Sequence, residues 1–339
     1  GHPAVGDPAG SLEALAASRP AAASPAAADT PVAVIYTGGT TGASRGAVHT
    51  QASLFASGLN CVCMGGIPRE SRCLLVLPLF HSGAIGLAIA QLLQRGTIVV
   101  GPMFRPDILR QAVTELGADA LAFVPTMLGM LLDDPGFDPA DYRGVRGVTY
   151  GASPMPAALL QRVLAAFPAA AISQIYGMTE VGIAIVLSDR WHRGPGARPD
   201  AAGQPGPLYR VRIVDAQGRD LPRGQLGEVT FQGPGLMQGY LNKPGETAAV
   251  LDAGGLRSGD AGIMDEQGIV TLLDRVKDMI VTGGENVYSV EVENAISMHP
   301  AVAQCAVVGA PDDAYGERVH AVVVLKPGAA LELEQLRQH

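Results

Sequence analysis

The sequence predicts an α/β protein: a large domain of mostly parallel strands covered by helices, a small antiparallel β subdomain, and a small α+β C-terminal domain that is incomplete in this chain. Three observations predict it. Between Pro31 and about Gly177, short β-branched and apolar runs alternate with helical segments. After about Pro207, strand-like runs follow one another with only turns between them. The length of 339 residues fits one large and one smaller domain.

The alternating region has the pattern of a parallel sheet, whose sites lie at the carboxyl ends of the strands. Its most apolar stretch, 74–93, is broken by Pro78, His81 and Gln91, so we expect a buried strand and a helix rather than a membrane span. The segment 105–117 is amphipathic and ends in glycine, as helices do. We expect strands at 31–37, 72–79, 97–101, 119–125, 147–151 and 171–177, and helices at about 49–62, 105–117 and 156–167.

The later part of the chain has the pattern of antiparallel strands. We expect strands at 209–215 and 227–233 and a hairpin over 262–274, then a strand pair, a helix at about 289–298, strands at 304–309 and 319–325, and the start of a helix. Residues 1–30 are rich in Ala, Pro and Ser, which favours a linker or surface loop. The predicted domains are 1–30 as that linker, 31–274 as part of the large domain, and 275–339 as part of the C-terminal domain.

The chain carries 32 Asp and Glu against 24 Lys and Arg, for a net charge of −8. An acidic chain is a poor candidate for binding a nucleic-acid backbone or an anionic membrane. The four cysteines form no C-x-x-C pair, so we expect free thiols in a reducing compartment. The N-terminus lacks the pattern of a signal peptide. We therefore expect a cytoplasmic protein with a small-molecule substrate, no nucleic-acid partner and no membrane insertion.

The segment 36–48, YTGGTTGASRGAV, is the strongest chemical signal. Closely spaced glycines let backbone N–H groups approach an anion, the hydroxyls add donors, and Arg45 adds a fixed positive charge. The loop is not a Walker A motif, because no Gly-Lys-Ser/Thr follows at the required spacing. It also imitates the dinucleotide loop of short-chain dehydrogenases, but Val48 stands where their last glycine would fall, and no tyrosine has a lysine four residues on. A phosphate-binding loop is therefore expected.

Three further segments accompany this loop: QIYGMTE (174–180), SGD (258–260), which we expect to present its acid in a turn, and DRVKDMIVTGGENVYSVEVE (274–293). Together with the loop, they resemble the adenylate-forming superfamily of acyl-CoA synthetases, peptide-synthetase adenylation domains and luciferases. The resemblance covers about 31–339, in the family's order of motifs. The sequence departs from the family's usual YTSGTTGxPKG loop, because Gly38, Ser44 and Arg45 replace Ser, Pro and Lys.

The resemblance implies a nucleotide site with assigned roles. Thr179 would bind the α-phosphate of ATP, and Glu180 would coordinate Mg²⁺, which prefers oxygen ligands. Asp260 would accept hydrogen bonds from the ribose hydroxyls, and Arg275 would reach the same sugar. The β- and γ-phosphates would be held by Thr37, Gly38, Gly39, Thr40, Thr41, Gly42, Ser44 and Arg45, and the adenine by Gly151, Ala152, Ser153, Tyr176 and Gly177.

The resemblance also implies residues for the second substrate and for a domain rotation. His81 would lie between the carboxylate pocket and the pantetheine tunnel. Lys277 would be the hinge of a small mobile C-terminal domain, and the loop containing Gly283, Gly284 and Glu285 would face coenzyme A. Small and apolar residues would form the pocket floor, which favours an apolar acyl or aryl carboxylate. These floor residues are Phe123–Thr126, Gly151, Gly177 and Gly182–Ile185.

The implied activity is ATP-dependent activation of an apolar, fatty or aryl carboxylic acid to an acyl-adenylate, followed by transfer to the thiol of coenzyme A. Two alternatives stay open: transfer to a carrier protein, and a homologue that binds nucleotide or acyl-adenylate without turnover. The family's adenylation lysine follows the helix that begins near Leu331, whereas this chain ends at His339 and Lys326 does not match that position. We therefore expect the chain to be part of a longer enzyme that also has a preceding segment.

Overall fold

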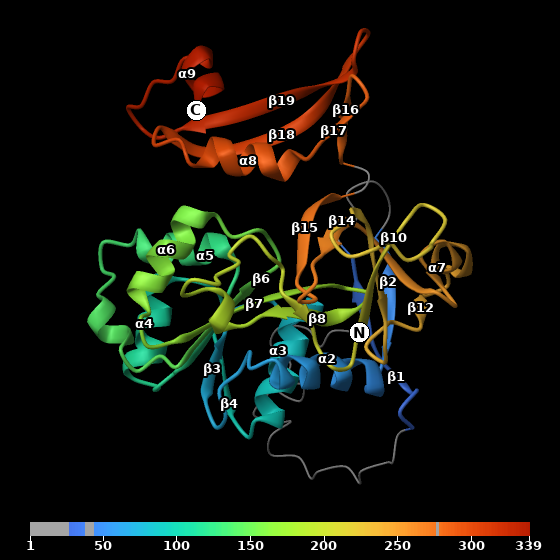
Figure 1. Ribbon diagram of the computed structural model, residues 1–339. Coiled ribbons are helices and arrows are strands. Elements are labelled where there is room, and N and C mark those ends of the chain that lie inside the picture. Colours follow the sequence, from blue (N-terminus) through green and yellow to red (C-terminus); the bar gives the residue numbers. More distant parts are fainter. Residues whose placement is uncertain (1–26, 38–43, 276–277) are drawn as a thin grey trace.

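The computed structural model describes residues 27–37, 44–275 and 278–339 and confirms the α/β prediction (Figure 1). Its main sheet has seven strands in the order β4-β3-β5-β6-β7-β8-β9. The strands from β4 to β7 pair in parallel, whereas β8 and β9 run antiparallel to their neighbours. The strands are β3 (Arg72–Leu75), β4 (Thr97–Val100), β5 (Ala120–Phe123), β6 (Gly147–Gly151), β7 (Ala171–Met178), β8 (Gly182–Leu187) and β9 (Gln204–Pro205).

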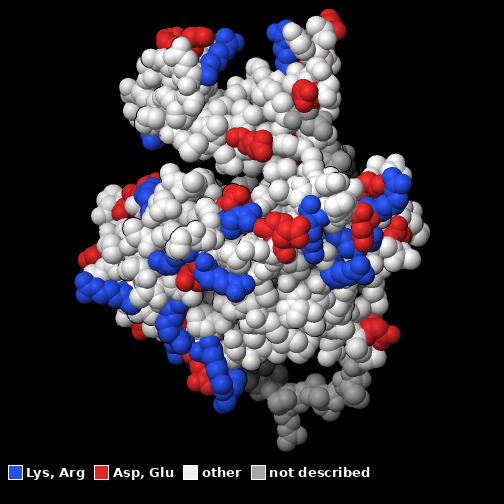
Figure 2. Space-filling model, in the orientation of Figure 1, with Lys and Arg blue, Asp and Glu red and all other residues white. Residues whose placement is uncertain are grey.

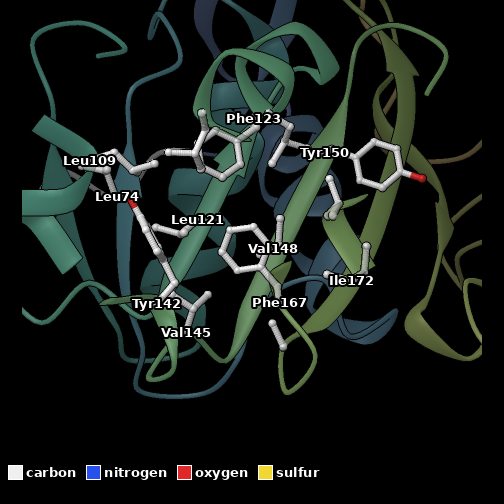
Figure 3. Close-up of a cluster of buried hydrophobic side chains, with 14 of the residues drawn as sticks. Leu74, Leu109, Leu121, Phe123, Tyr142, Val145, Val148, Tyr150, Phe167 and Ile172 are labelled. Atoms are coloured by element: carbon white, nitrogen blue, oxygen red, sulfur yellow. The ribbon is translucent and has the colours of Figure 1, made fainter. Parts of the chain in front are cut away.

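Helices cover both faces of this sheet because its strands are apolar on both sides. Leu121 and Phe123 of β5 point to a cluster with helices α4, α5 and α6, whereas Ala122 packs toward α2 and α3 (Figures 1 and 3). The helices are α2 (Gln51–Cys63), α3 (Ser82–Leu93), α4 (Pro106–Thr114), α5 (Pro125–Leu132) and α6 (Ala157–Ala166), with short 3₁₀ turns at Pro139–Tyr142 and Asp189–Trp191.

Two expectations for this sheet were wrong in detail. The strand expected at 72–79 ends at Leu75, since the chain leaves the sheet before Pro78, which could not donate a ladder hydrogen bond. Helix α5 was not predicted, because the residues after β5 were assigned only to a pocket floor. That helix starts with Pro125 in its first turn, where the missing N–H costs nothing.

The loop expected to bind phosphate belongs to a separate antiparallel sheet in the order β1-β2-β12, with β1 (Pro31–Tyr36), β2 (Gly46–Thr50) and β12 (Gly239–Tyr240). The prediction of a strand leading through the loop directly to a helix was therefore wrong. Residues 46–50 are extended and pair antiparallel with β1, so a second strand precedes the helix. Helix α2 begins only after Thr50, whose side chain caps it by accepting from the Ser53 N–H at 3.0 Å.

The predicted antiparallel subdomain is present as a five-stranded sheet in the order β10-β11-β14-β13, with β15 also pairing β14. Asp260 was expected in a turn but lies within strand β14, opposite Arg275 on β15. Gly259 beside it has a φ of 73°, which lets the strand deform locally. The elements are β10 (Arg210–Val214), β11 (Gly227–Gln232), α7 (Pro244–Val250), β13 (Leu251–Asp252), β14 (Gly255–Met264) and β15 (Val270–Arg275).

The last part of the chain forms a four-stranded antiparallel sheet in the order β17-β16-β19-β18, as expected for an α+β unit (Figure 1). Its core includes Ile280, Ile296 and Val302. Asp274 at the end of β15 accepts hydrogen bonds from the Ser289 N–H and hydroxyl, both at 2.7 Å. The predicted boundary at 274/275 stays a prediction. The elements are β16 (Ile280–Thr282), β17 (Glu285–Val287), α8 (Ser289–Ser297), β18 (Val302–Asp312), β19 (Gly316–Leu325) and α9 (Leu333–Gln338).

Acidic and basic side chains are interspersed on the face shown in Figure 2, and no continuous basic surface covers it. All four cysteines are free thiols, as predicted. Burial raises the pKa of Cys61 and of Cys73 to about 12, so both stay protonated near neutral pH. Among the helices that the structure describes, none has both the length and the apolar character needed to cross a membrane.

Candidate functional site

A cavity of about 960 Å³ opens along the carboxyl edge of the parallel sheet, where the sequence pattern placed the site. The turns after β3, β5, β6 and β7 line it, together with α3 and the β2–β12 side of the molecule. Ten predicted site residues share this cavity: Thr37, Arg45, His81, Gly151, Ala152, Tyr176, Gly177, Thr179, Glu180 and Arg275.

The remaining predicted site residues that the structure describes lie outside the lining of this cavity. Asp260 is outside the lining but bonds to two residues that are part of it. Ser44 and Ser153 are exposed near the ends of β2 and β6. Gly283 and Gly284 form an exposed turn between β16 and β17, and the exposed Glu285 begins β17. Gly38, Gly39, Thr40, Thr41, Gly42 and Lys277 lie outside the described residues.

Backbone and small residues form the inner wall of the cavity. A Cβ atom on Gly151 would lie 2.4 Å from the Ile175 carbonyl oxygen, and one on Gly177 would lie 1.7 Å from the Gly182 carbonyl oxygen. Real Cβ atoms do not approach so closely, so both positions require glycine. Ala152 follows with a φ of 70°, a left-handed conformation that is uncommon for a residue with a side chain. This wall therefore exposes backbone N–H and C=O groups, which a flat, polar ligand can approach closely.

The turn after β7 holds Thr179 and Glu180 from behind. The His49 ring, which is 1% exposed, places Nε2 2.7 Å from the Thr179 carbonyl oxygen and Nδ1 3.0 Å from the Ser53 hydroxyl. Burial lowers the pKa of His49, although the Thr179 carbonyl and the Glu180 charge oppose this effect. The neutral ring donates through Nε2 and accepts through Nδ1. His49 thereby fixes a backbone segment 130 residues away.

The Glu180 carboxylate is buried, with 6% of the residue exposed. The Tyr240 hydroxyl donates to its Oε1 atom at 2.6 Å. Burial and the hydrogen bond to Glu180 both raise the pKa of Tyr240, so this phenol remains a donor. A carboxylate held in this way keeps its second oxygen available. It suits Mg²⁺, which takes one or two protein carboxylates together with ligand phosphates and water.

Tyr176, Asp260 and Arg275 form a second cluster. The Tyr176 hydroxyl donates to Asp260 Oδ2, and Arg275 Nε lies 2.9 Å from Asp260 Oδ1. Burial raises the pKa of Asp260, while Tyr176 and Arg275 oppose this shift. Burial and the Asp260 charge hold the pKa of Tyr176 well above its ordinary value. The cluster thus combines an aromatic ring with a carboxylate that can accept further hydrogen bonds from hydroxyl groups.

Three charged side chains that line the cavity and contact one another form what we call its charged end: Arg45, Lys243 and Glu246. The Arg45 guanidinium lies 4.8 Å from the centroid of the Tyr240 ring, and Arg45 Nε lies 3.7 Å from Glu246 Oε2. Lys243 Nζ lies 2.5 Å from Glu246 Oε1. The sequence analysis missed Lys243 and Glu246 as site residues. One signal was present, because Lys243 is one of only three lysines in the chain.

Apolar side chains line the third part of the cavity. Phe123, Val124, Gly182 and Ile183 lie here as predicted for the floor, whereas Pro125, Thr126, Ala184 and Ile185 do not line the cavity. His81 is exposed at the N-cap of α3, with its ring 4.6 Å from that of Phe80. Further lining residues that the sequence analysis did not single out are Leu77, Pro78, Ala84, Leu87, Met127 and Ile175.

The fold and the cavity define a class: an α/β protein with a pocket at the switch edge of its sheet, charged at one end and apolar at the other. The sequence profile of the AMP-binding enzyme family matches residues 3–241, and the profile of the AMP-binding enzyme C-terminal domain matches 291–339. The chain belongs to the AMP-binding enzyme family, in agreement with the resemblance to adenylate-forming enzymes.

Several curated proteins are similar to this chain. The fatty acid–[acyl-carrier-protein] ligase ScoC of Streptomyces coeruleorubidus is 42% identical over 88% of this chain and 59% of its own length. The feruloyl-CoA synthase of an Amycolatopsis species is 35% identical over 97% of this chain and 66% of its own length. The chain thus spans less than two thirds of the length of these relatives.

Solved structures show the same fold. The ATP-bound structure of MatB from Rhodopseudomonas palustris superimposes with a TM-score of 0.84 at 32% identity, over 92% of this chain and 61% of that one. The o-succinylbenzoate CoA synthetase MenE from Bacillus subtilis, in complex with the acyl-adenylate intermediate OSB-AMP, has a TM-score of 0.82 at 29% identity. That match covers 92% of this chain and 62% of that one.

Proposed function

We propose that the protein containing this chain activates an apolar carboxylic acid, fatty or aryl, with Mg·ATP and transfers the acyl group to the thiol of coenzyme A. One observation carries the proposal: ten residues predicted for nucleotide, metal and acid binding, from segments far apart in the sequence, line one cavity. Membership of the AMP-binding family and the nucleotide-bound structures of its relatives support the same assignment.

The cavity's polar parts suit the parts of ATP. The peptide edge at Gly151 and Ala152, with the Tyr176 ring, would hold the adenine, and Asp260 with Arg275 would hold the ribose. Arg45, Thr37 and Thr179 would contact the phosphates. Glu180 would be the protein's ligand to Mg²⁺. When bound, the metal would supply positive charge to phosphate oxygens, and the residues of this chain would orient the α-phosphate at Thr179.

The apolar part of the cavity supports an acid with an apolar tail. Its lining includes Leu87 of α3, Phe123 of β5 and Met127 of α5. No lysine or arginine lies among the lining residues that these three elements contribute. A tail that carries a second charge would therefore lose hydration there without gaining a partner. Fatty and aryl acids are both named as substrates of the relatives described above, in ScoC and in the feruloyl-CoA synthase.

The reaction consists of two displacements. A carboxylate oxygen attacks the α-phosphorus, the bond to the β-phosphate breaks, and pyrophosphate leaves. The thiolate sulfur then attacks the acyl carbon, and AMP leaves with the electron pair of the mixed anhydride bond. Negative charge grows on phosphate oxygens in the first step, so Arg45 and the hydroxyl donors stabilise it most when they are already in place.

Exchange of labelled pyrophosphate into ATP tests this function. A panel of aliphatic, aryl and hydroxy acids is offered to the full-length protein, and exchange is expected with apolar members only. Exchange with none of them would contradict the proposal and would favour a homologue that binds nucleotide without turnover. A hydrolysis-resistant acyl-adenylate analogue should bind in either case, so calorimetry with this analogue identifies a misfolded preparation.

One observation favours a carrier protein as the acceptor of the acyl group. ScoC, whose name identifies an acyl-carrier protein as its acceptor, is 42% identical to this chain. Thioester formation with coenzyme A should therefore be compared with formation on a panel of phosphopantetheinylated carrier proteins. We expect coenzyme A to be the better acceptor. If thioester formed only on carrier proteins, a carrier protein would take the place of coenzyme A as the proposed acceptor.

A further inference from the structure

The charged end of the cavity contains more than the phosphate ligands that the sequence suggested. Glu246 lies in the first turn of α7, and its two carboxylate oxygens contact different cations. Oε1 lies 2.5 Å from Lys243 Nζ, and Oε2 lies 3.7 Å from Arg45 Nε. All three residues line the cavity. A single carboxylate therefore accepts a hydrogen bond from Lys243 and forms a longer ion pair with Arg45.

Among the described residues that meet here, four charges balance before any ligand is considered. Arg45 and Lys243 contribute two positive charges, and Glu246 and Glu180 contribute two negative ones. Glu180 is already engaged by the Tyr240 hydroxyl, and the Tyr240 ring also lies against the Arg45 guanidinium. Glu180 is buried, but the side chains of Arg45, Lys243 and Glu246 are 37%, 34% and 42% exposed. Water can therefore replace their mutual contacts at small cost.

We propose that Glu246 is a displaceable counter-ion that competes with phosphate oxygens for Arg45 and Lys243. The proposal rests on the proposed function, since it assigns the polyphosphate end of the same cavity, and it adds Lys243 as a phosphate ligand. Phosphate oxygens take over the donors of both cations when Mg·ATP binds, and the Glu246 carboxylate turns to solvent. When pyrophosphate leaves, the carboxylate returns to the cations, which lowers the affinity for this product.

The test uses the sign of the effect of Glu246→Gln, which keeps the shape of the side chain and removes its charge. Calorimetry of the full-length protein with Mg·pyrophosphate and Mg·ATP should show tighter binding, by about fivefold, since partly exposed ion pairs contribute up to about 1 kcal/mol. In a Lys243→Met background, pyrophosphate should bind more weakly and the gain from Glu246→Gln should shrink, because one of the contested cations is gone.

A matched control is Glu334→Gln, which changes the net charge equally at an exposed pair with Arg337 on α9 (3.4 Å). This variant should bind both ligands like the unaltered chain. Equal or weaker binding by Glu246→Gln, with normal binding by the unaltered chain, would overturn the counter-ion assignment alone, because Glu246 would then only position the two cations. If the unaltered full-length protein bound neither ligand, the proposed function would be overturned with it.

Discussion

The inner wall of the cavity and its charged end consist of different chemical groups. The wall consists of backbone and small residues at the carboxyl edge of the parallel sheet, where Gly151 and Gly177 pack against neighbouring strands without free space. The charged end consists of partly exposed side chains such as Arg45, which directly precedes β2, and Glu246 in the first turn of α7. Steric contacts hold the wall in place, whereas attraction between opposite charges holds the side chains of the charged end. Substitutions should therefore affect folding at the wall and ligand affinity at the charged end.

The largest effect should come from the wall. In Gly177→Ala, the new Cβ atom would lie 1.7 Å from the Gly182 carbonyl oxygen, and two paired strands would have to separate. We expect the free energy of unfolding to fall by about 3 kcal/mol. Urea denaturation measures it. The control is Gly83→Ala on α3, where nothing lies within 4 Å of the added atom, so stability should stay the same or rise slightly. Equal midpoints for both variants would contradict the steric account.

The next largest effect should come from the cluster behind Tyr176. Asp260→Ala removes the acceptor proposed for two ribose hydroxyls, and hydrogen bonds to a charged group contribute about 1.5–3 kcal/mol. AMP should bind at least about tenfold more weakly in calorimetry, while the chain stays folded. Arg275 is 54% exposed and would remain solvated without its partner, but the Tyr176 hydroxyl would lose its acceptor, so the free energy of unfolding should fall by about 1–3 kcal/mol. Unchanged affinity for AMP would remove Asp260 from the nucleotide site.

The same residue predicts a pH dependence. Burial raises the pKa of Asp260 above its ordinary value, so this carboxyl begins to take up a proton at a higher pH than an exposed aspartate. Binding of adenosine, which has no phosphate groups of its own to titrate near neutral pH, should therefore weaken as the pH falls through this raised pKa. We expect a loss of about tenfold at most, since the protonated group keeps part of its accepting capacity. An Asp260→Ala variant should lack this dependence.

The smallest of these effects should come from the support of Glu180. Tyr240→Phe removes the 2.6 Å hydrogen bond to Oε1, which leaves the buried carboxylate free to rotate. We expect about fivefold weaker binding of ATP in the presence of Mg²⁺ and little change without the metal. The control is Tyr209→Phe, whose buried hydroxyl donates to the Val181 carbonyl oxygen at 2.8 Å without contacting Glu180. An equal loss with and without Mg²⁺ would contradict a metal-related role for Tyr240.

Local patterns in the sequence predicted most of the fold and the inner wall. The alternation of apolar runs and helical segments located β5, β6 and β7, and the ends of these strands located the cavity. Motifs such as QIYGMTE span only a few residues, so their resemblance to the family can be identified without knowledge of distant contacts.

Contacts between distant segments could not be predicted in this way. His49 binds the Thr179 carbonyl across 130 residues, and it does so only because β2 and the turn after β7 meet in the folded chain. The hairpin formed by β1 and β2 was missed for a related reason. A five-residue strand between a glycine-rich loop and a helix has too weak a local signal to be distinguished from an extended linker.

The sequence by itself determined the α/β class and the order of the motifs, because these depend on local pattern. The residues assigned to adenine, ribose and magnesium rest on the resemblance to adenylate-forming enzymes and stay predictions. Only the tertiary structure decided that Lys243 and Glu246 join Arg45, since this requires β12 to pair with β2 and bring α7 to the cavity. Pairing between strands far apart in the chain depends on the whole sheet. The balance of charge at the charged end therefore depends on the fold and does not follow from any local segment of the sequence.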